Sequence, residues 1–246
     1  MQTRFVIPSR KRPFDCLFAE NLIPEATIVV HESEFKEYKE VLSTDKNLYT
    51  HKLDNIARIR QWILDEFKEE CIVFVDDDLK FAQCHVGEKV RKITDENAIK
   101  QIIMNAAQIA KDLDISLFGF TRRPAPMHFK PFDPFEFCKS LVAGTWGIIG
   151  RKYRFDSNLT TREDIDISMQ SLLEDRIMFI DTRFYFQHGN LVTRGEGGNQ
   201  GVRTHKSEIK DMNIIANKWG KLVDLQKKKK KTTGCTIHVN RRQYNG

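Results

Sequence analysis

The sequence predicts an α/β fold built on a doubly wound, mostly parallel sheet. Short apolar strands alternate with amphipathic helices through the first part of the chain, which is the order that builds parallel sheets. The clearest strand lies in the stretch Cys71–Leu79, where an apolar, β-branched run meets Asp76, Asp77 and Asp78. Three unpaired carboxylates are too costly to bury, so the strand must leave the sheet there. In open α/β sheets, ligands bind at this carboxyl edge of the strands.

Three strand–helix pairs are expected before this stretch. Pro13 and Pro24 limit the first helix to the residues between them, and Asp54 or Asn55 can cap the third. The isoleucines of the third helix recur at helical spacing. The expected elements are the strand Arg4–Pro8, the helix Phe14–Leu22, the strand Ala26–His31, the helix Phe35–Leu42, the strand Leu48–His51 and the helix Asn55–Phe67.

The second half of the chain is less regular. The segment Arg122–Pro134 is rich in proline and excludes regular structure. It is either a loop over the site, with Arg122, Arg123 and Lys130 towards an anion, or a packed surface connection. The other expected elements are the helix Asn97–Leu113, the strand Ser116–Phe120, a glycine-spaced apolar stretch Leu141–Gly150 with Trp146 as a stacking or core residue, the helix Ile165–Leu173, the strand Ile177–Phe186, the helix Glu208–Leu225 and a short edge strand Cys235–Val239.

The 246 residues predict one domain, or one domain with a tail. The net charge is +6, of which Lys227–Lys231 contributes five, so the rest of the chain carries only +1. Such a block is either a solvated run or a contact for a polyanion. We therefore expect a globular domain over residues 1–225 and a basic C-terminal tail over residues 226–246.

Composition also excludes some classes of protein. No apolar run approaches the roughly 20 residues needed to cross a bilayer. The N-terminal residues lack the apolar core of a signal peptide. The five cysteines are scattered and form no CxxC pair, which fits reduced thiols. These features predict a cytoplasmic protein.

The three aspartates indicate a metal site. On extended backbone, Asp76 and Asp78 point to the same side because they are two residues apart. Two hard oxygen ligands facing one spot suit Mg²⁺ or Mn²⁺, which usually completes its shell with water and substrate phosphates. The alternative is a polar turn or helix cap without a metal. A second carboxylate pair, Glu163 and Asp164, opens a later helix, where Thr161 with Asp164 also fits a capping box.

Four stretches together resemble a known family. They are FVIPSRKRP, FVDDDL, TREDIDISMQSLL and GGNQGVR. With a DxD motif, an xED motif and a later histidine, the chain resembles nucleotide-sugar glycosyltransferases of the GT-A fold over about Arg4–Leu225. Within that fold, the stretches resemble the TET-associated glycosyltransferases, which are phage and eukaryotic relatives of the base J glucosyltransferase.

The resemblance implies a role for each site residue. Asp164 would be the general base and Glu163 would orient acceptor or sugar hydroxyls. The metal ligands would be Asp78, Asp76 and one of two histidines, His188 or His205. Glu32 is either a nucleoside contact or an exposed residue at a helix start. The donor-binding residues would be Pro8, Ser9, Arg10, Glu32, Arg60, Asp76, Asp77 and Lys206, with the arginines and the lysine on phosphate.

The resemblance also implies a reaction. A sugar would move, with inversion, from a UDP-sugar such as UDP-glucose to a hydroxymethylated pyrimidine in DNA. The tail Lys227–Lys231, with Arg241 and Arg242, would contact DNA phosphates. A phage-type protein of this kind would act in the host cytoplasm. Three alternatives remain: a glycosyltransferase with a carbohydrate or protein acceptor, a nucleotidyltransferase, and a non-catalytic nucleic-acid-binding protein.

Overall fold

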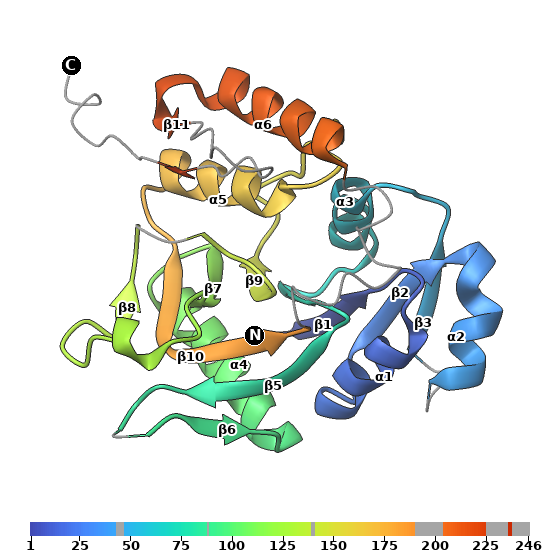
Figure 1. Cartoon of the computed structure of the whole chain (residues 1–246), viewed down its shortest axis with the longest axis horizontal. Coiled ribbons are helices and arrows are strands. Elements are labelled where there is room, and N and C mark those ends of the chain that lie inside the picture. The colour runs from blue at the N-terminus through green and yellow to red at the C-terminus, as the bar shows by residue number, and fades with distance from the viewer. Residues whose placement is uncertain (43–46, 88, 139–140, 190–203, 225–235, 238–246) are drawn as a thin grey trace.

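The computed structural model describes residues 1–42, 47–87, 89–138, 141–189, 204–224 and 236–237. Within these residues, ten strands form one sheet in the order β3-β2-β1-β4-β9-β7-β10-β5-β6, and β8 pairs with β10 beside this path. Figure 1 shows this sheet running through the middle of the molecule with helices on both faces. The expected α/β architecture with flanking helices is confirmed. No helix of the described residues is both long and apolar enough to cross a membrane.

One half of the sheet, which we call the parallel half, contains the first four strands. β1 pairs in parallel with β2 and β4, and β2 pairs in parallel with β3. Helices connect these strands, as parallel pairing requires. The elements are β1 (Thr3–Pro8), α1 (Pro13–Leu22), β2 (Thr27–His31), the 3-10 helix η1 (Glu32–Glu34), α2 (Phe35–Val41), β3 (Leu48–His51), α3 (Ile56–Glu66) and β4 (Cys71–Val75).

The other half, which we call the mixed half, combines both pairing directions. β9 is antiparallel to β4 and β7, whereas β10 is parallel to β7 and antiparallel to β5. The elements are β5 (Leu79–Cys84), β6 (Arg91–Ile93), α4 (Glu96–Asp112), β7 (Leu117–Thr121), the 3-10 helix η2 (Pro126–His128), β8 (Phe135–Glu136), β9 (Thr145–Ile149), α5 (Glu163–Glu174), β10 (Phe179–His188), α6 (His205–Trp219) and η4 (Gly220–Leu222), followed by a separate pair, β11 (Val223–Asp224) and β12 (Thr236–Ile237).

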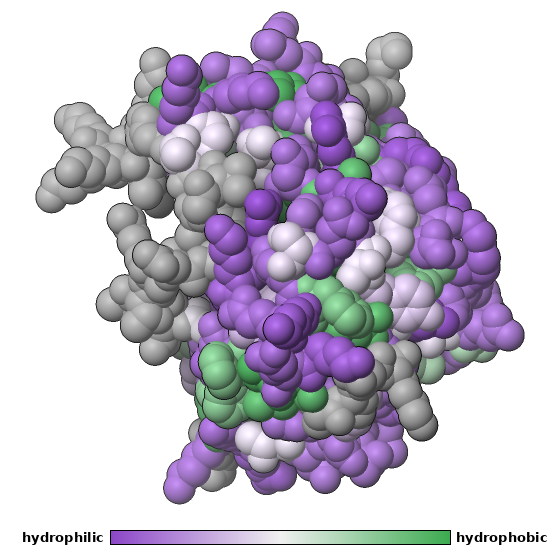
Figure 2. Space-filling view, turned by 90° about the vertical axis from the view of Figure 1, so that its right-hand side faces the viewer, coloured by the Kyte–Doolittle hydropathy of each residue, from purple (hydrophilic) through white to green (hydrophobic). Residues whose placement is uncertain are grey.

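The core has two parts because strand side chains alternate between the faces of the sheet. Along β1, Phe5 and Ile7 pack with α1, α2 and α4, whereas Val6 packs with α3, α5 and α6. Figure 1 shows α3, α5 and α6 together on one side of the sheet. Figure 2, which faces the outer side of the parallel half, shows a largely hydrophilic surface with small hydrophobic areas. Because the strands are buried on both faces, the polar side chains that could contact a ligand lie near the strand ends.

The strand leaves the sheet at the three aspartates, as expected, so it is shorter than the stretch Cys71–Leu79. β4 ends at Val75, Asp76–Asp78 form a turn, and a new strand begins at Leu79. The backbone N–H of Leu79 donates to the carbonyl oxygen of Asp76 at 3.2 Å, which closes the turn. The strand ends here because carboxylates are too costly to bury among apolar side chains unless polar groups pair with them, as Ser9 pairs with Asp77. The hairpin β5–β6 was not expected from the sequence.

Other differences are small. The last helix ends at Trp219, short of Leu225, because Gly220 takes a positive φ of 55° that stops the helix. The expected capping box is absent, since α5 is capped at Arg162 and the hydroxyl of Thr161 donates to Asp211 instead. The expected strand near the C-terminus is present as β12, paired with β11. The lysines of the expected tail, Lys227–Lys231, lie outside the described residues.

Candidate active site

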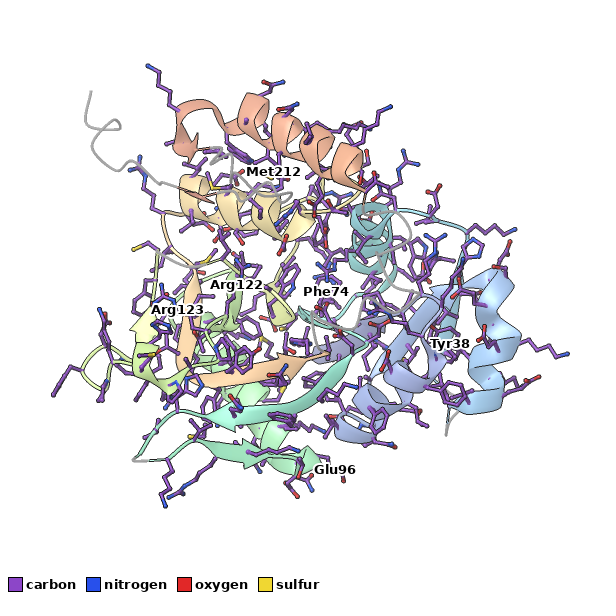
Figure 3. The ribbon with its side chains drawn as sticks, in the orientation of Figure 1. Tyr38, Phe74, Glu96, Arg122, Arg123 and Met212 are labelled. Carbon is purple, nitrogen blue, oxygen red and sulfur yellow. The ribbon has the colours of Figure 1, made fainter. Side chains whose placement is uncertain are left out.

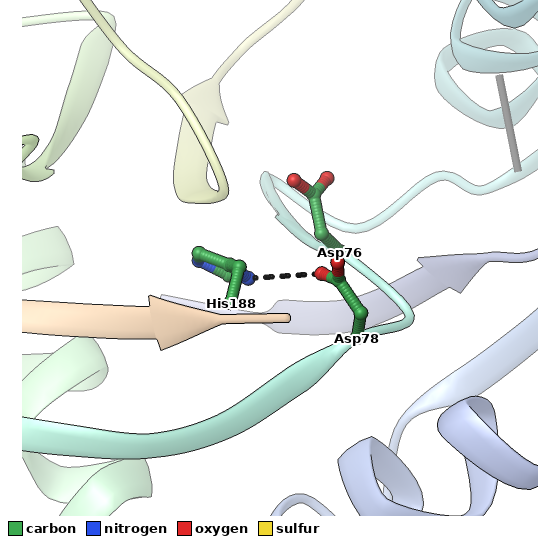
Figure 4. A group of neighbouring side chains, drawn as sticks. All are labelled: Asp76, Asp78 and His188. Carbon is green, nitrogen blue, oxygen red and sulfur yellow. Dashed lines mark ion pairs between the residues drawn. The ribbon is translucent and has the colours of Figure 1, made fainter. Parts of the chain in front are cut away.

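Asp76, Asp78 and His188 lie together at the carboxyl edge of the sheet. One ligand atom from each lies within 4.8 Å of the others. Figure 4 shows the three side chains and the ion pair between His188 and Asp78. Nδ1 of His188 lies 3.5 Å from Oδ1 of Asp78. Both ring nitrogens of His188 are buried and lack a hydrogen-bond partner among the described residues. A buried imidazole without such a partner, beside two carboxylates, is a donor set that fits a divalent metal ion.

The charges of this cluster shift one another's pKa values. Burial raises the pKa of Asp76 above its ordinary value, although His188 and Arg60 oppose the shift. For Asp78 burial acts in the same direction, but His188 and Arg12 outweigh it and lower the pKa overall. Burial alone would lower the pKa of His188, and the Asp78 and Asp76 carboxylates raise it overall. The group therefore favours a positive charge at its centre.

Two glycines let the backbone approach this cluster closely. Gly144 has a φ of +69°, and a Cβ there would overlap the ring of His188. Its carbonyl oxygen accepts from the N–H of Asp76 at 3.2 Å. A Cβ on Gly189 would lie 2.9 Å from Oδ2 of Asp78. The glycine-spaced stretch therefore leaves room for the ring of His188 at this edge, whereas Trp146 is a fully buried core residue.

Asp77 points away from the cluster into a buried polar network of the parallel half. The hydroxyl of Ser9 donates to Oδ2 of Asp77 at 2.6 Å, and it lies 2.7 Å from the hydroxyl of Tyr38. The guanidinium of Arg12 lies 3.7 Å from Asp77 and 3.8 Å from Asp78. Burial raises the pKa of Asp77 to about 7. Ser9 and Asp77 thus join the Pro8–Arg12 loop to the aspartate turn.

Arg60 connects the aspartate turn to the second carboxylate pair. Its guanidinium donates to Glu163 at 2.6 Å and to Asp76 at 3.2 Å. The same group lies over the rings of Phe74 and Trp146, 5.4 and 5.2 Å from their centroids. Figure 3 labels Phe74 near the middle of the molecule. Arg60 is almost fully buried, so the structure gives it a role in holding carboxylates, and its contact with phosphate stays a prediction.

Glu163 and Asp164 begin α5 beside this arginine. The residue before them, Arg162, has a φ of 67°, which is uncommon for a side chain other than glycine. Burial raises the pKa of Glu163 to about 7 against the opposing charge of Arg60, and the charge of Asp164 adds to the rise. Asp164 is only half-buried, and its Oδ1 accepts from the N–H of Ile165. Because Arg60 donates to both Glu163 and Asp76, one guanidinium connects the two carboxylate pairs.

Helix α6 holds the start of α5 in place. The buried Asp211 accepts four hydrogen bonds from the N–H and hydroxyl groups of Thr160 and Thr161. The buried Asp166 accepts from Lys218 and Trp219. Sequence reasoning missed these roles, as it missed Arg12 and Tyr38. The available signal was a carboxylate, Asp211, on the same helical face as apolar residues of α6.

The remaining predicted site residues lie around the edge. Arg10 donates to the carbonyl oxygen of Asp54 at 2.9 Å and follows the buried Pro8 at the end of β1. Glu32 is half-exposed and pairs with Lys52 at 3.5 Å, so it resembles the exposed alternative more than a buried contact. Lys206 is exposed on the first turn of α6. His205 begins the same helix, but its side chain is outside what the structure describes.

A family model described as TET-Associated Glycosyltransferase matches residues 3–196, which include both carboxylate pairs and His188. The chain belongs to the TET-associated glycosyltransferase family. The match confirms the family that the four sequence stretches resemble.

Solved structures support the fold. The chain is similar to S. aureus TarS 1-349 in complex with UDP, with a TM-score of 0.51, 13% identity and coverage of 88% of this chain and 65% of that one. The same protein in complex with UDP-GlcNAc gives a TM-score of 0.47, 14% identity and coverage of 88% and 67%. The chain thus spans 65% of the length of TarS 1-349, less than two thirds, and the likeness to its UDP complex supports the GT-A type of fold. No curated protein sequence matches the chain significantly.

Proposed function

We propose that the protein is a metal-dependent, inverting glycosyltransferase that moves a sugar from a UDP-sugar to the hydroxyl of a hydroxymethylated pyrimidine in DNA. The observation that carries the proposal is the cluster of Asp76, Asp78 and His188, which Arg60 connects to the start of α5 by donating to both Asp76 and Glu163. The cluster suits a cation, and the start of α5 supplies the half-buried carboxylate of Asp164. Membership of the TET-associated glycosyltransferase family supports this choice of acceptor, which the sequence resemblance implies.

The donor is proposed to lie along the carboxyl edge of the parallel half, where ligands of α/β sheets bind. The loop after β1, with Pro8, Ser9 and Arg10, would hold the nucleotide, supported by Glu32, Asp77 and Lys206. The UDP and UDP-GlcNAc complexes of TarS, which has a similar fold, support a uridine diphosphate donor. Glucose remains the expected sugar for this family.

Each side chain has a distinct task in the proposed reaction. Asp164 removes the proton of the acceptor hydroxyl while the oxygen of that hydroxyl attacks the anomeric carbon of the sugar. The bond between the anomeric carbon and the diphosphate oxygen breaks on the opposite side. Glu163 orients acceptor or sugar hydroxyls while Arg60 fixes its position. Asp76, Asp78 and His188 would hold the metal, with His205 as the alternative histidine. A bound Mn²⁺ or Mg²⁺ would supply Lewis-acid stabilisation of the charge on the leaving diphosphate.

The acceptor surface is proposed to be basic. Lys227–Lys231 would neutralise DNA phosphates, and this contribution falls as salt rises. Deleting these lysines should weaken DNA binding and flatten its salt dependence, with little change in UDP affinity. A DNA acceptor of this kind would place the enzyme in the cytoplasm of a phage-infected cell.

The test uses the full chain with UDP-glucose, Mn²⁺ and DNA that contains hydroxymethylcytosine, hydroxymethyluracil or neither. We expect mass spectrometry to detect hexose-linked nucleosides only from the hydroxymethylated DNAs. The Asp164→Asn variant should form none. Transfer of hexose to a carbohydrate or protein but to no DNA would show that the acceptor is not DNA. Release of pyrophosphate in place of UDP would identify a nucleotidyltransferase.

A further inference from the structure

We propose that the segment Arg122–Pro134, here called the proline arm, binds duplex DNA and inserts an apolar side chain beside the target base. This proposal rests on the proposed function, because it assumes a DNA acceptor. The sequence alone did not decide whether this segment is a loop over the site or a packed surface connection. Its side chains and its place on the sheet favour a surface that meets a partner.

The arm leaves the sheet at the same edge as the catalytic groups. β7 ends at Thr121, which pairs with Tyr185 on β10, and β10 continues to His188. On its other side β7 pairs with β9, whose preceding residue Gly144 contacts both Asp76 and His188. One strand therefore separates the base of the arm from the metal cluster. In Figure 3, Arg122 and Arg123 lie on the opposite side of Phe74 from Tyr38, away from the parallel half.

The arm contains no β-strand, but prolines and hydrogen bonds restrict its backbone. Prolines at 124, 126, 131 and 134 fix four φ angles in thirteen residues. A 3-10 helix, η2, occupies its middle, and the N–H of Asp133 donates to the carbonyl of Lys130 at 3.0 Å. At its end, both the N–H and the hydroxyl of Thr182 donate to the carbonyl of Pro134. A preorganised arm loses little conformational entropy when it binds.

The tip of the arm exposes two large apolar side chains. Phe132 is 101% exposed and Met127 is 83% exposed, more than any other large hydrophobic residue that the structure describes. The next most exposed is Phe14 on α1, at 69%. Full exposure of a phenylalanine on a rigid arm has no benefit for folding. Proteins that bend DNA use such Phe and Met residues as wedges between base steps.

The charge of the arm indicates the partner. Arg122, Arg123 and Lys130 are all exposed, and the arm contains a single acidic residue, Asp133. Cations beside an exposed aromatic ring match a polymer that offers phosphates and stacked bases together. Many enzymes that act on one base extrude it from the duplex, and an apolar side chain between base steps would assist that movement. Duplex DNA is therefore the partner that fits the exposed side chains of the arm.

The first experiment tests whether the exposed apolar side chains of the arm insert into DNA. Full-length protein with both Phe132→Ala and Met127→Ala is compared with Phe18→Ala, which removes an exposed phenylalanine from α1. The substrate is duplex DNA with one hydroxymethylated base and a neighbouring 2-aminopurine, whose fluorescence increases when it unstacks. For the double variant we expect about a tenfold loss of kcat/KM and no increase in 2-aminopurine fluorescence on binding. On a single-stranded oligonucleotide of the same sequence the loss should be smaller, and UDP affinity should not change.

The second experiment measures the phosphate contacts. Arg122→Ala with Arg123→Ala should lower the slope of log Kd against log salt for duplex DNA by about 2. The control, Lys36→Ala with Lys39→Ala on α2, removes equal charge and should leave the slope unchanged.

Three results would decide against the proposal. If the arm variants match their controls on duplex DNA while the wild type transfers hexose, the arm has no acceptor role and the proposed function stands. If 2-aminopurine fluorescence still increases with the variant that carries Phe132→Ala and Met127→Ala, the arm does not unstack the base. If the wild type neither binds nor modifies any DNA, the proposed function itself fails.

Discussion

The two halves of the sheet use their polar residues differently. In the parallel half, polar side chains near the strand ends bond mainly to one another, as in the buried set Ser9, Tyr38 and Asp77. In the mixed half, the long strand β10 delivers His188 to the edge, and the proline arm exposes apolar and basic side chains to solvent. The polar network of the first half therefore fixes the shape of the proposed donor edge, whereas the second half exposes side chains to solvent. The catalytic edge forms where β4 of one half borders β9 of the other.

The largest expected effect tests whether both halves build the metal site. Asp78→Ala from the parallel half and His188→Ala from the mixed half should each abolish tight Mn²⁺ binding. Transfer should fall roughly a thousandfold, because several kcal/mol of charge stabilisation are lost. Calorimetric titration with Mn²⁺, and transfer rates after chelation of the wild type with EDTA, provide the measurements. Unchanged Mn²⁺ affinity in His188→Ala would confine the site to the parallel half.

Asp164→Asn should separate chemistry from donor binding. The amide cannot accept the acceptor proton, so kcat should fall roughly a hundredfold or more. UDP and Mn²⁺ affinities should stay close to those of the wild type, since Asp164 lies on α5 and outside the cluster of Asp76, Asp78 and His188. Steady-state kinetics with calorimetry of UDP binding measure both quantities. A kcat within tenfold of the wild type would require another general base.

Arg60 tests the connection between the two carboxylate pairs. Arg60→Met should destabilise the protein by about 3 kcal/mol, because Asp76 and Glu163 lose their shared cation in a buried site. Urea unfolding measures this free energy. Arg58→Met is the matched control, since Arg58 is exposed on the same helix, and its effect should stay within about 0.5 kcal/mol. Equal effects of the two substitutions would contradict the bridging role.

The smallest expected effect concerns His51 at the end of β3. Burial lowers its pKa to about 4, with help from the charges of His31 and Arg10. The unfolded chain keeps the ordinary value of about 6.5, so it binds more protons than the folded protein between these limits. The contribution of His51 to stability is thus present above pH 6.5 and decreases as the pH falls towards 4.

The substitution His51→Asn isolates this term. An asparagine oxygen can replace Nδ1 of His51 as the acceptor for the N–H of Leu53. Between pH 7 and pH 5, the wild type should lose up to about 2 kcal/mol more unfolding free energy than the variant. Parallel pH profiles would show that His51 is protonated equally in both states.

The sequence predicted the parallel half well because its signals are local. Apolar runs and helical spacing report burial, so the order of strands and helices up to Val75 agrees with the structure within a few residues. The mixed half depends on pairing between distant strands. The hairpin β5–β6 and the position of β9 between two antiparallel neighbours have no local signal of comparable strength.

The sequence by itself determined that carboxylates gather at the end of a buried strand and at the start of a later helix. Tertiary structure decided which of them act together. It turned Asp77 inward to Ser9, brought His188 to Asp78, and placed Arg60 between Asp76 and Glu163. The physical reason is that a side chain's spacing along the chain fixes its face on one element. The charges it meets depend on how separate elements pack.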